Sequence, residues 1–467
     1  MSANSQKKLW QGRFNASSSE ILEEFNASIG FDYRMYIQDI FASKVHAEML
    51  AKQKIISKED FKAISEALDK IQTQIEKDPE AWAKARISDE DIHLAVEREL
   101  TELIGDAGKK LHTARSRNDQ VVTDLRLWMK QELSQVKGLL KDLRSSFVTR
   151  AKQDIDTILP GYTHLQQAQP ISLGHFWLAH EARFARDSER LEDALKRIDI
   201  NPLGSGALAG STFNIDREFT TKKLGFSRAS ENSLDAVSDR DFVAEYEFVL
   251  SLAMVHLSQF AEEMIIWNSQ EFGFIEISDS FATGSSMMPQ KKNPDIPELL
   301  RGKAGRVIGV LNALLITLKS LPLAYNKDLQ EDKELLFMAN DTVKKCLKIS
   351  SDFLMEITVN SDRMLESLSK SFSAATDIAE YLVKKGLPFR EAYNAVGSIV
   401  KHCIEEKKQF SNLSMAEWKS LNSNFEEDIQ EKISALACVD ARDIQGATSR
   451  KQVKEAIKFS EKRLKNV

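Results

Sequence analysis

The sequence predicts an all-α protein with an elongated central bundle of five long helices, flanked by two smaller helical domains. Glycine and proline number only 19 and 9 among the 467 residues, roughly half of average usage. So few chain-breaking residues favour long helices over many short strands. Apolar residues also recur every three or four positions through the middle of the chain, which is the spacing of one helical face.

The five long helices are predicted over residues 121–147, 172–198, 241–268, 297–319 and 332–354. The first carries the longest apolar stripe, formed by Val121, Leu125, Met129, Leu133, Val136, Leu140, Leu143 and Phe147. Ser172 is the expected N-cap of the second helix. The third helix is apolar nearly all round, as expected of a helix enclosed by other helices. Because one chain alone need not enclose it, the sequence also indicates oligomerisation.

The segments on either side of the bundle contain shorter amphipathic pieces. We expect an N-terminal helical cap domain over residues 1–111 and the bundle, with its active-site loops, over 112–360. A C-terminal helical domain is expected over 361–467, with a break in its helical pattern at Gly386-Leu387-Pro388.

Composition excludes several classes of protein. The net charge is −6 with positive and negative residues interleaved, whereas a nucleic-acid or anionic-membrane binder would carry a basic stripe. Apolar runs such as residues 310–316 stop far short of the ~20 residues that a membrane span needs. No secretory signal is visible before Trp10. The scattered cysteines, Cys346, Cys403 and Cys438, fit a reduced, cytoplasmic compartment.

The most unusual stretch is the loop of residues 283–294, TGSSMMPQKKNP. Gly284 frees the backbone and two serines follow it, which suits a mobile lid. Two prolines keep their predecessors out of a helix, and the lysines and asparagine between them can donate to a carboxylate. The alternative is a surface loop that ends in a helix cap, with Asp295 as N-cap and Glu298 at the third helical position.

Two further stretches precede long helices. His164 stands beside Thr163 in residues 160–166, where it either faces a shared cavity or is a satisfied core or capping residue. Residues 112–120, HTARSRNDQ, directly precede the longest helix. Cations and an amide at a helix N-terminus suit an anion site, although a solvated charge cluster is the alternative. Residues 25–32 and 325–333 are weaker signals, and an ordinary surface loop explains the second equally.

Other kinds of site are not supported. The loop of residues 201–210, NPLGSGALAG, lacks the Gly-Lys-Ser/Thr ending and the clear preceding strand of a phosphate cradle, so we expect a tight structural loop. His175 and His180 do not share a helical face, and the eight histidines make no convincing metal set. No Gly-x-Ser-x-Gly elbow is present.

Together these stretches resemble the argininosuccinate lyase family, within the fumarase/aspartase superfamily. The loop of residues 284–293 is close to the superfamily pattern Gly-Ser-Ser-x-Met-Pro-x-Lys-x-Asn. Residues 115–120 (RSRNDQ), residues 161–166 (GYTHLQ) and the QKKN form of the main loop narrow the resemblance to this family. It extends from Leu9–Phe14 to the final helices, with one small departure at Ala114, where glycine is commoner in the family.

The resemblance implies a set of functional residues. Its catalytic members would be Ser285 on the mobile loop, His164 as the acid/base partner, Glu298 as the carboxylate that orients this histidine, and Lys291, which with Asn293 holds the succinyl carboxylates. The substrate-binding members would be Ser28, Ser116, Arg117, Asn118, Thr163, Asn293, Tyr325, Gln330 and Lys333, and the resemblance adds Asp32 and His93 to the same pockets. It also implies a fumarase/aspartase-like homotetramer whose active sites each draw on three subunits.

The implied reaction is the reversible β-elimination of argininosuccinate to arginine and fumarate through a carbanion-like intermediate. Removal of the C–H proton loads negative charge onto the adjacent carboxylate, so its donors should bind the intermediate more tightly than the substrate. We expect Ser285 to be the base once the loop closes, with His164 as the acid or proton relay. The reversed assignment stays open. No metal or organic cofactor is needed, and the reaction would be the last step of arginine biosynthesis or part of urea-cycle nitrogen metabolism.

Three rival functions remain. Another superfamily lyase would act on adenylosuccinate, aspartate or malate. A non-catalytic structural protein could keep the same fold, but it would not require the intact polar set. A helical scaffold for partner proteins would carry exposed apolar stripes on the bundle surface, and none is expected outside the core pattern.

Overall fold

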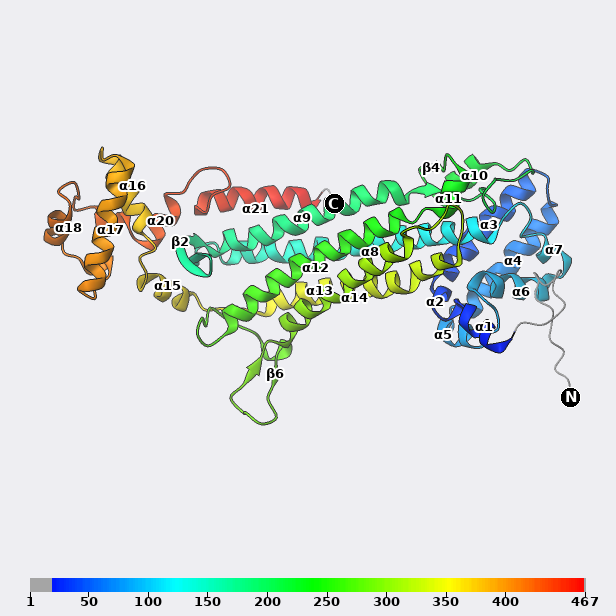
Figure 1. Ribbon diagram of the computed structural model, residues 1–467, viewed down its shortest axis with the longest axis horizontal. Coiled ribbons are helices and arrows are strands. Elements are labelled where there is room, and N and C mark those ends of the chain that lie inside the picture. The colour runs from blue at the N-terminus through cyan, green and yellow to red at the C-terminus, as the bar shows by residue number, and fades with distance from the viewer. Residues whose placement is uncertain (1–18, 466–467) are drawn as a thin grey trace. The chain divides into compact units, whose positions relative to one another are not determined.

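The computed structural model describes residues 19–465 of the chain (Figure 1). Leu9–Phe14, where the family resemblance begins, lies outside the described residues. Two compact units make up the chain. The first combines the described residues up to Gln135 with Leu191–Phe248 and Ile308–Asp341, and the second combines Val136–Arg190, Val249–Val307 and the residues from Thr342 onward. The predicted domain boundaries near residues 111 and 360 stay a prediction.

All five predicted long helices are present, within a few residues of their predicted bounds. They are α8 (Arg117–Gln153), α9 (Leu173–Ile198), α12 (Asp241–Asn268), α13 (Asp295–Leu318) and α14 (Glu331–Glu356) (Figure 1). Ser172 caps α9 as predicted, because its Oγ accepts the Gly174 N–H at 3.2 Å. Each of these helices contributes residues to both units.

The long helices pack against one another through aromatic side chains in the second unit and are joined by buried hydrogen bonds in the first. In the second unit, the Phe147 ring of α8 lies 5.8 Å from Phe184 of α9 and 5.3 Å from Phe260 of α12, between ring centroids. In the first unit, the Tyr246 hydroxyl of α12 donates to Asn340 of α14 at 2.7 Å, and Asn340 donates to Glu132 of α8 at 2.6 Å. These hydrogen bonds satisfy polar groups that would otherwise be buried at a cost.

The remaining helices of the first unit are α1 (Glu20–Asn26), α2 (Ile29–Asp32), α3 (Tyr36–Lys52), α4 (Lys58–Ile75), α5 (Pro79–Lys84), α6 (Ile92–Ile104), α7 (Asp106–Lys109), α10 (Arg217–Leu224) and α11 (Ser233–Ser238). Their core includes Ile64, Leu68 and Leu100, all fully buried. A capping box formed by Ser57 and Asp60 begins α4. This packed core holds the N-terminus of α6 and that of α8, where the site residues of this unit lie.

The remaining helices of the second unit are α15 (Ser361–Ser369), α16 (Ala375–Lys384), α17 (Phe389–Glu405), α18 (Met415–Leu421), α19 (Ile429–Lys432), α20 (Ala435–Asp440) and α21 (Arg450–Lys465). A separate core is centred on Trp418 and Phe425, both fully buried. The predicted break between helices is confirmed, since α16 ends at Lys384 and Gly386 takes a φ of 100°, which favours glycine.

Short strands join the helices, and the sequence did not predict them. The longest pair is the antiparallel hairpin of β1 (Ile158–Thr163) and β2 (Gln166–Ser172). The other pairs are β3 (Ile200–Asn201) with β4 (Arg228–Ala229), β5 (Ile275–Glu276) with β8 (Thr358–Val359), and β6 (Thr283–Gly284) with β7 (Lys292–Asn293). Because every strand outside the hairpin has two residues, the predicted all-α class is confirmed.

Helix α12 is as apolar as predicted. Along it only Asp241, Phe248 and Gln259 are exposed. Within the described residues it is the one helix long and apolar enough to cross a membrane by length and composition, and half of its most apolar window is buried. A helix at the core of a bundle has the same composition, so this property is weak evidence for a membrane.

Candidate active site

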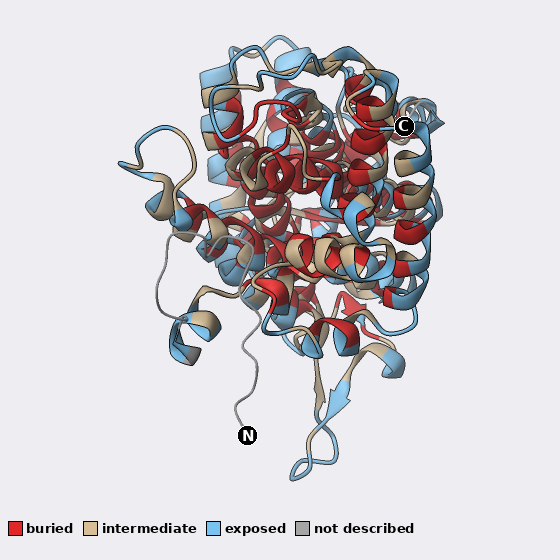
Figure 2. Cartoon of the chain, turned by 90° about the vertical axis from the view of Figure 1, so that its right-hand side faces the viewer, coloured by how far each residue is buried: buried red, intermediate tan, exposed pale blue. Residues whose placement is uncertain are grey.

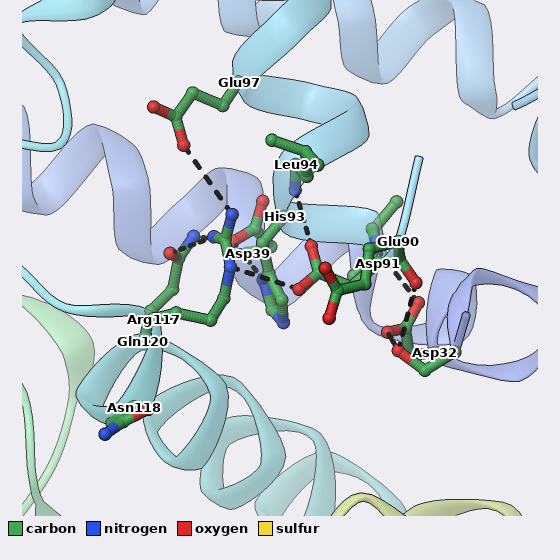
Figure 3. Close-up of polar contacts among 12 residues, drawn as sticks. Asp32, Asp39, Glu90, Asp91, His93, Leu94, Glu97, Arg117, Asn118 and Gln120 are labelled. Atoms are coloured by element: carbon green, nitrogen blue, oxygen red, sulfur yellow. Dashed lines mark hydrogen bonds and ion pairs between the residues drawn. The ribbon is translucent and has the colours of Figure 1, made fainter. Parts of the chain in front are cut away.

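In the first unit, the segment before α6 holds several predicted site residues together (Figure 3). Asp91 is the N-cap of α6, and its Oδ1 accepts the Leu94 N–H at 2.6 Å. Its Oδ2 pairs with Arg117 Nε at 3.1 Å. Burial alone would raise the pKa of Asp91, but the positive charges of Arg117 and His93 lower it. One carboxylate therefore caps a helix and anchors a guanidinium expected to bind substrate.

Ser28 and Asp32 lie against the same segment. The Ser28 Oγ donates to Asp32 Oδ2 at 2.6 Å, and the Ile92 N–H donates to Asp32 Oδ1 at 3.0 Å. The backbone N–H of Ser28 donates to the Glu90 carbonyl at 2.7 Å. Burial, followed by the negative charge of Asp91, raises the pKa of Asp32 to about 6. The structure thus brings Ser28 and Asp32 together, as the predicted set requires.

His93 lies fully buried among carboxylates rather than on an open surface. Its Nδ1 is 2.8 Å from Asp39 Oδ1 and 3.3 Å from Asp124 Oδ2. Burial alone would lower the pKa of His93, but the charge of Asp39 and the hydrogen bonds to both carboxylates raise it to about 10. Burial and the charge of Asp39 in turn raise the pKa of Asp124 to about 7. An imidazolium therefore balances two buried aspartates.

This group has the composition of a metal site, which histidine spacing did not reveal. One ligand atom from each of Asp39, His93 and Asp124 lies within 4.8 Å of the others. The Nδ1 of His93 already contacts both carboxylates, so a proton at this nitrogen occupies the place where a metal ion would bind. The geometry fits a shared proton better than a cation, and the absence of a metal requirement stays a prediction.

The start of α8 carries Ser116, Arg117 and Asn118. The Ser116 Oγ accepts the Asn118 N–H at 3.2 Å, and Asn118 Nδ2 donates to the Ala207 carbonyl at 3.1 Å. Just before it, Ala114 takes a φ of 60°, a left-handed conformation that glycine adopts more readily. A glycine, which the family resemblance leads us to expect at this position, would adopt this backbone at lower cost.

The glycine-rich loop of residues 201–210 binds a negatively charged group, which is the side chain of Asp119 and not a ligand. Asp119 Oδ2 accepts the N–H groups of Gly204 at 3.0 Å and Gly206 at 2.8 Å, and its Oδ1 accepts that of Ser116 at 2.9 Å. Burial raises the pKa of Asp119, and these three donors oppose the rise. The loop is thus the structural element expected from the sequence, and Asp119 holds it against the N-terminus of α8.

Residues of the segment 325–333 complete the group in the first unit. Gln330 Nε2 donates to the Asn26 carbonyl at 3.3 Å. Lys333 is 3% exposed and pairs with Asp332, which also pairs with Arg240. Burial, followed by the charge of Asp332, raises the pKa of Tyr325 to about 12.

In the second unit, Thr163 and His164 lie at the end of the β1–β2 hairpin. His164 and Leu165 form its two-residue turn, with φ values of 55° and 58°. Positive φ at both central positions is the property of a type I′ turn, which suits the twist of paired strands. Thr163, His164 and Leu165 are all exposed. The hairpin therefore presents an imidazole at its tip, which neither of the alternatives, a core or a capping histidine, describes.

Ser285 lies at the start of a loop that the short strands β6 and β7 close. Its Oγ accepts the N–H groups of Met287 at 3.3 Å and Met288 at 3.1 Å. The loop extends away from the helices of its unit and is largely exposed (Figures 1 and 2). Lys291 is exposed, and Asn293 is half-buried in β7.

Glu298 is exposed in the first turn of α13. The proposed cap is wrong, because α13 begins at Asp295 itself and Asp295 accepts a hydrogen bond from the Thr283 hydroxyl. Among the described residues of this single chain, no hydrogen bond or ion pair joins Glu298 to His164. The expected orientation of that histidine by Glu298 stays a prediction.

Sequence reasoning missed four acidic residues of the group in the first unit: Asp39, Glu90, Asp91 and Asp124. Asp91 could have been predicted from the sequence, because it precedes His93 by two residues and an N-cap aspartate is a local signal. Asp39 and Asp124 come from other helices, and no local pattern joins them to His93.

Comparison with known proteins identifies the family to which this chain belongs. A family model described as "Lyase" matches residues 12–309, and one described as "Argininosuccinate lyase C-terminal" matches residues 372–440. The argininosuccinate lyase of Pelotomaculum thermopropionicum is 50% identical over 98% of this chain and 99% of its own length, and that of Moorella thermoacetica is 52% identical over 96% of both. The chain belongs to the argininosuccinate lyase family. The predicted family, its place in the fumarase/aspartase superfamily and the predicted enzyme class, a lyase, are confirmed.

Solved structures agree with the fold of this lyase. An EDDS lyase variant with bound fumarate has a TM-score of 0.83 and 25% identity, covering 97% of this chain and 91% of its own. The 3-carboxy-cis,cis-muconate lactonizing enzyme from Pseudomonas putida has a TM-score of 0.75 at 20% identity, with 96% and 98% coverage.

Proposed function

We propose that this enzyme eliminates fumarate from argininosuccinate with Ser285 and His164 as its acid/base pair. The overall reaction, which yields arginine and fumarate, follows from membership of the argininosuccinate lyases, and arginine biosynthesis follows from the same assignment. The observation that carries the residue assignment is the environment of the Ser285 hydroxyl, which accepts two backbone N–H groups.

Those two N–H groups address the main weakness of a serine base. A serine hydroxyl is a poor base because its alkoxide is unstable in water. Two backbone donors aimed at Oγ stabilise negative charge there, as an oxyanion hole does. A closed loop that excludes water would strengthen both contacts. Ser285 is therefore the group we propose to take the C–H proton, and His164 the group that protonates the departing guanidino nitrogen or relays its proton.

The substrate would be held by the residues that the first unit groups around Asp91. Arg117 and Asn118 at the start of α8, with Tyr325 and Gln330, offer donors to carboxylates, and Ser28, whose hydroxyl donates to Asp32, offers an acceptor. Lys291 and Asn293 would donate to the carboxylate on which charge builds, so they should contribute more to the transition state than to substrate binding. Thr163, Ser116 and Lys333 complete the proposed binding set, with Asp32 and His93 behind it.

A homotetramer would assemble this site from three subunits. His164 and the Ser285 loop are both exposed in one chain, which is unfavourable for proton transfers that require exclusion of water. Neighbouring subunits would supply the cover.

The surface of α13 supports such an assembly. The sequence predicts no exposed apolar stripe, and here the prediction is wrong: Ile308, Leu315 and Ile316 are 36%, 50% and 63% exposed. A Cβ added at Gly305 or Gly309 of the same helix would meet no atom within 4 Å. Glycine inside a helix costs about 1 kcal/mol relative to alanine, and within residues 19–465 no other part of the chain comes that near to either position. Close approach of a helix from another subunit would account for both features. We also propose that the enzyme is cytoplasmic, as its buried free cysteines suggest.

The test of the acid/base assignment is Ser285→Ala, measured by fumarate release under substrate saturation. We expect kcat to fall by on the order of 10²-fold or more, with argininosuccinate still bound. Ser280→Ala is the matched control, because this serine of the same segment is exposed and its hydroxyl, within the described part of the chain, bonds only to Ser278. Near-normal turnover of Ser285→Ala, or an equal loss in the control, would reject the assignment. Parallel assays with adenylosuccinate, aspartate and malate test the rival substrates.

If each active site is shared between subunits, two inactive variants should complement each other. Ser285→Ala and His164→Asn subunits are mixed, dissociated and reassembled. If the two residues of one site come from different subunits, up to about a quarter of the sites in random tetramers regain both wild-type residues. Recovered activity would support the shared site, and two inactive parents that stay inactive in verified hybrids would contradict it.

A further inference from the structure

Gln120 connects the buried carboxylates to Arg117 (Figure 3). It lies in the first turn of α8 and is 2% exposed. Its Nε2 donates to Asp39 Oδ1 at 2.6 Å, and its Oε1 accepts a hydrogen bond from Arg117 Nη1 at 2.6 Å. One amide thus contacts a buried anion at one end and a cation of the proposed substrate site at the other.

The buried charges determine which way this amide faces. Asp39 also contacts His93, and although burial would raise the pKa of Asp39, the charge and hydrogen bond of His93 hold it well below its usual range. A flipped amide would direct its oxygen at the Asp39 carboxylate and its NH₂ at the Arg117 guanidinium. Both contacts would be repulsive, so only one orientation of Gln120 is compatible with its neighbours.

Gln120 also completes the set of contacts that orients Arg117. The guanidinium pairs through Nε with Asp91 at 3.1 Å and, more loosely, through Nη2 with Glu97 at 3.7 Å. Nη1 is held by Gln120. A contact at Nη1 as well as at Nε restricts tilting of the guanidinium plane more than the contact at Nε does alone. The N–H groups that these contacts leave over are then directed at a fixed place.

We propose that Gln120 is a positioning residue of the lyase reaction, which transmits the fixed geometry of the Asp39–His93–Asp124 cluster to Arg117 and so orients its guanidinium toward a carboxylate of the substrate. The inference rests on the proposed role of Arg117 in substrate binding. Gln120 does not touch the substrate, and its effect passes entirely through Arg117.

A double-mutant cycle tests that dependence. Gln120→Leu should lower kcat/KM for argininosuccinate by about tenfold, the effect of one hydrogen bond to a charged group. Arg117→Lys keeps the charge but cannot make the planar contacts, and it should lower kcat/KM by at least as much. When both changes are combined, the loss should equal that of Arg117→Lys alone, because Gln120, the proposed relay between the buried cluster and Arg117, then has no guanidinium to orient.

A second variant guards against simple misfolding. Gln120→Glu keeps the shape, but it can donate to Asp39 only when its new carboxyl is protonated. The kcat/KM of this variant, divided by that of the wild type at each pH, should therefore be at least about threefold higher at pH 6 than at pH 8.5. A merely structural role would leave this ratio flat. Gln38→Leu is the matched control, since this buried amide bonds to Gln131 rather than to Arg117.

The outcomes separate the relay from the site on which it rests. If Arg117→Lys keeps full kcat/KM, the proposed role of Arg117 fails and the relay fails with it. If Arg117→Lys is impaired but Gln120→Leu is not, only the relay fails. Losses that multiply in the double variant, or an equal loss in Gln38→Leu, would also overturn the relay.

Discussion

A buried glutamate in α12 gives this enzyme a pH-dependent stability that one substitution should remove. Glu247 is 1% exposed, and its Oε2 has no hydrogen-bond partner among the described residues. Burial, followed by the negative charge of Asp332, raises its pKa from 4.5 to about 8. The folded chain therefore keeps a proton on Glu247 at pH values where the unfolded chain has released it.

The sign and size of the effect follow from this difference. Below pH 4.5 both states are protonated and Glu247 costs nothing through ionisation. As pH rises toward 8, the folded state binds more protons than the unfolded state, so the free energy of unfolding falls. Each pH unit in this window costs about 1.4 kcal/mol. Allowing for titration near pH 8, the wild type should lose about 2 kcal/mol between pH 6 and pH 8 through this one group.

Glu247→Gln keeps the shape of the side chain and does not titrate. The Tm of the variant minus that of the wild type, measured at fixed ionic strength, should grow by about 2 °C from pH 6 to pH 8, because the unfolding entropy of 467 residues is about 1 kcal/mol/K. Glu245→Gln on the same helix is the control, because Glu245 forms a partly exposed pair with Arg197, worth less than about 1 kcal/mol. A Tm difference that stays constant with pH for Glu247→Gln would refute the reasoning.

Two further substitutions test the backbone and the core. Ala114→Gly should raise the Tm by about 1 °C, because it relieves about 1 kcal/mol of left-handed strain. Ala107→Gly, inside α7, should lower it, and a gain in both variants would show that strain is not the cause. Arg144→Met should destabilise the second unit by about 3–5 kcal/mol, because it leaves Glu181 buried without its ion pair. The double change with Glu181→Leu should recover most of that loss in thermal unfolding, and no recovery would contradict the buried-pair explanation.

The long helices were predictable because the signal for them is local. Apolar spacing, N-caps such as Ser172 and helix breaks such as Gly386 all lie within a few residues of the structure they determine. The β1–β2 hairpin was not predictable on the same grounds. Its strands contain prolines, and its turn depends on a positive φ at His164 and Leu165, which residues of these types rarely adopt.

The types of residue at the site were predictable, but their grouping was not. Ser28, Arg117 and Tyr325 could be predicted as site residues because each stands in a distinctive local stretch of sequence. The contacts that hold them are tertiary: His93 and Asp39 are 54 residues apart in the chain. Within the motif at the start of α8, Asp119 and Gln120 were read as part of a pattern, and only the structure shows that one holds the glycine loop and the other holds Arg117.

The two parts of the proposed site differ in how they are held, and that difference has a chemical reason. The residues expected to bind substrate are anchored to largely buried polar groups, as Arg117 is to the Asp91 carboxylate and the Gln120 amide. The proposed acid/base residues lie on exposed turns, and the His164 turn accepts an unfavourable φ at Leu165 as well. Strain of this kind persists where the placement of a side chain outweighs its cost. A rigid binding surface fixes the substrate, while exposed turns can move to admit it and then close. Substitutions in the buried network should therefore change KM together with stability, whereas substitutions at Ser285 or His164 should change kcat and leave stability nearly intact.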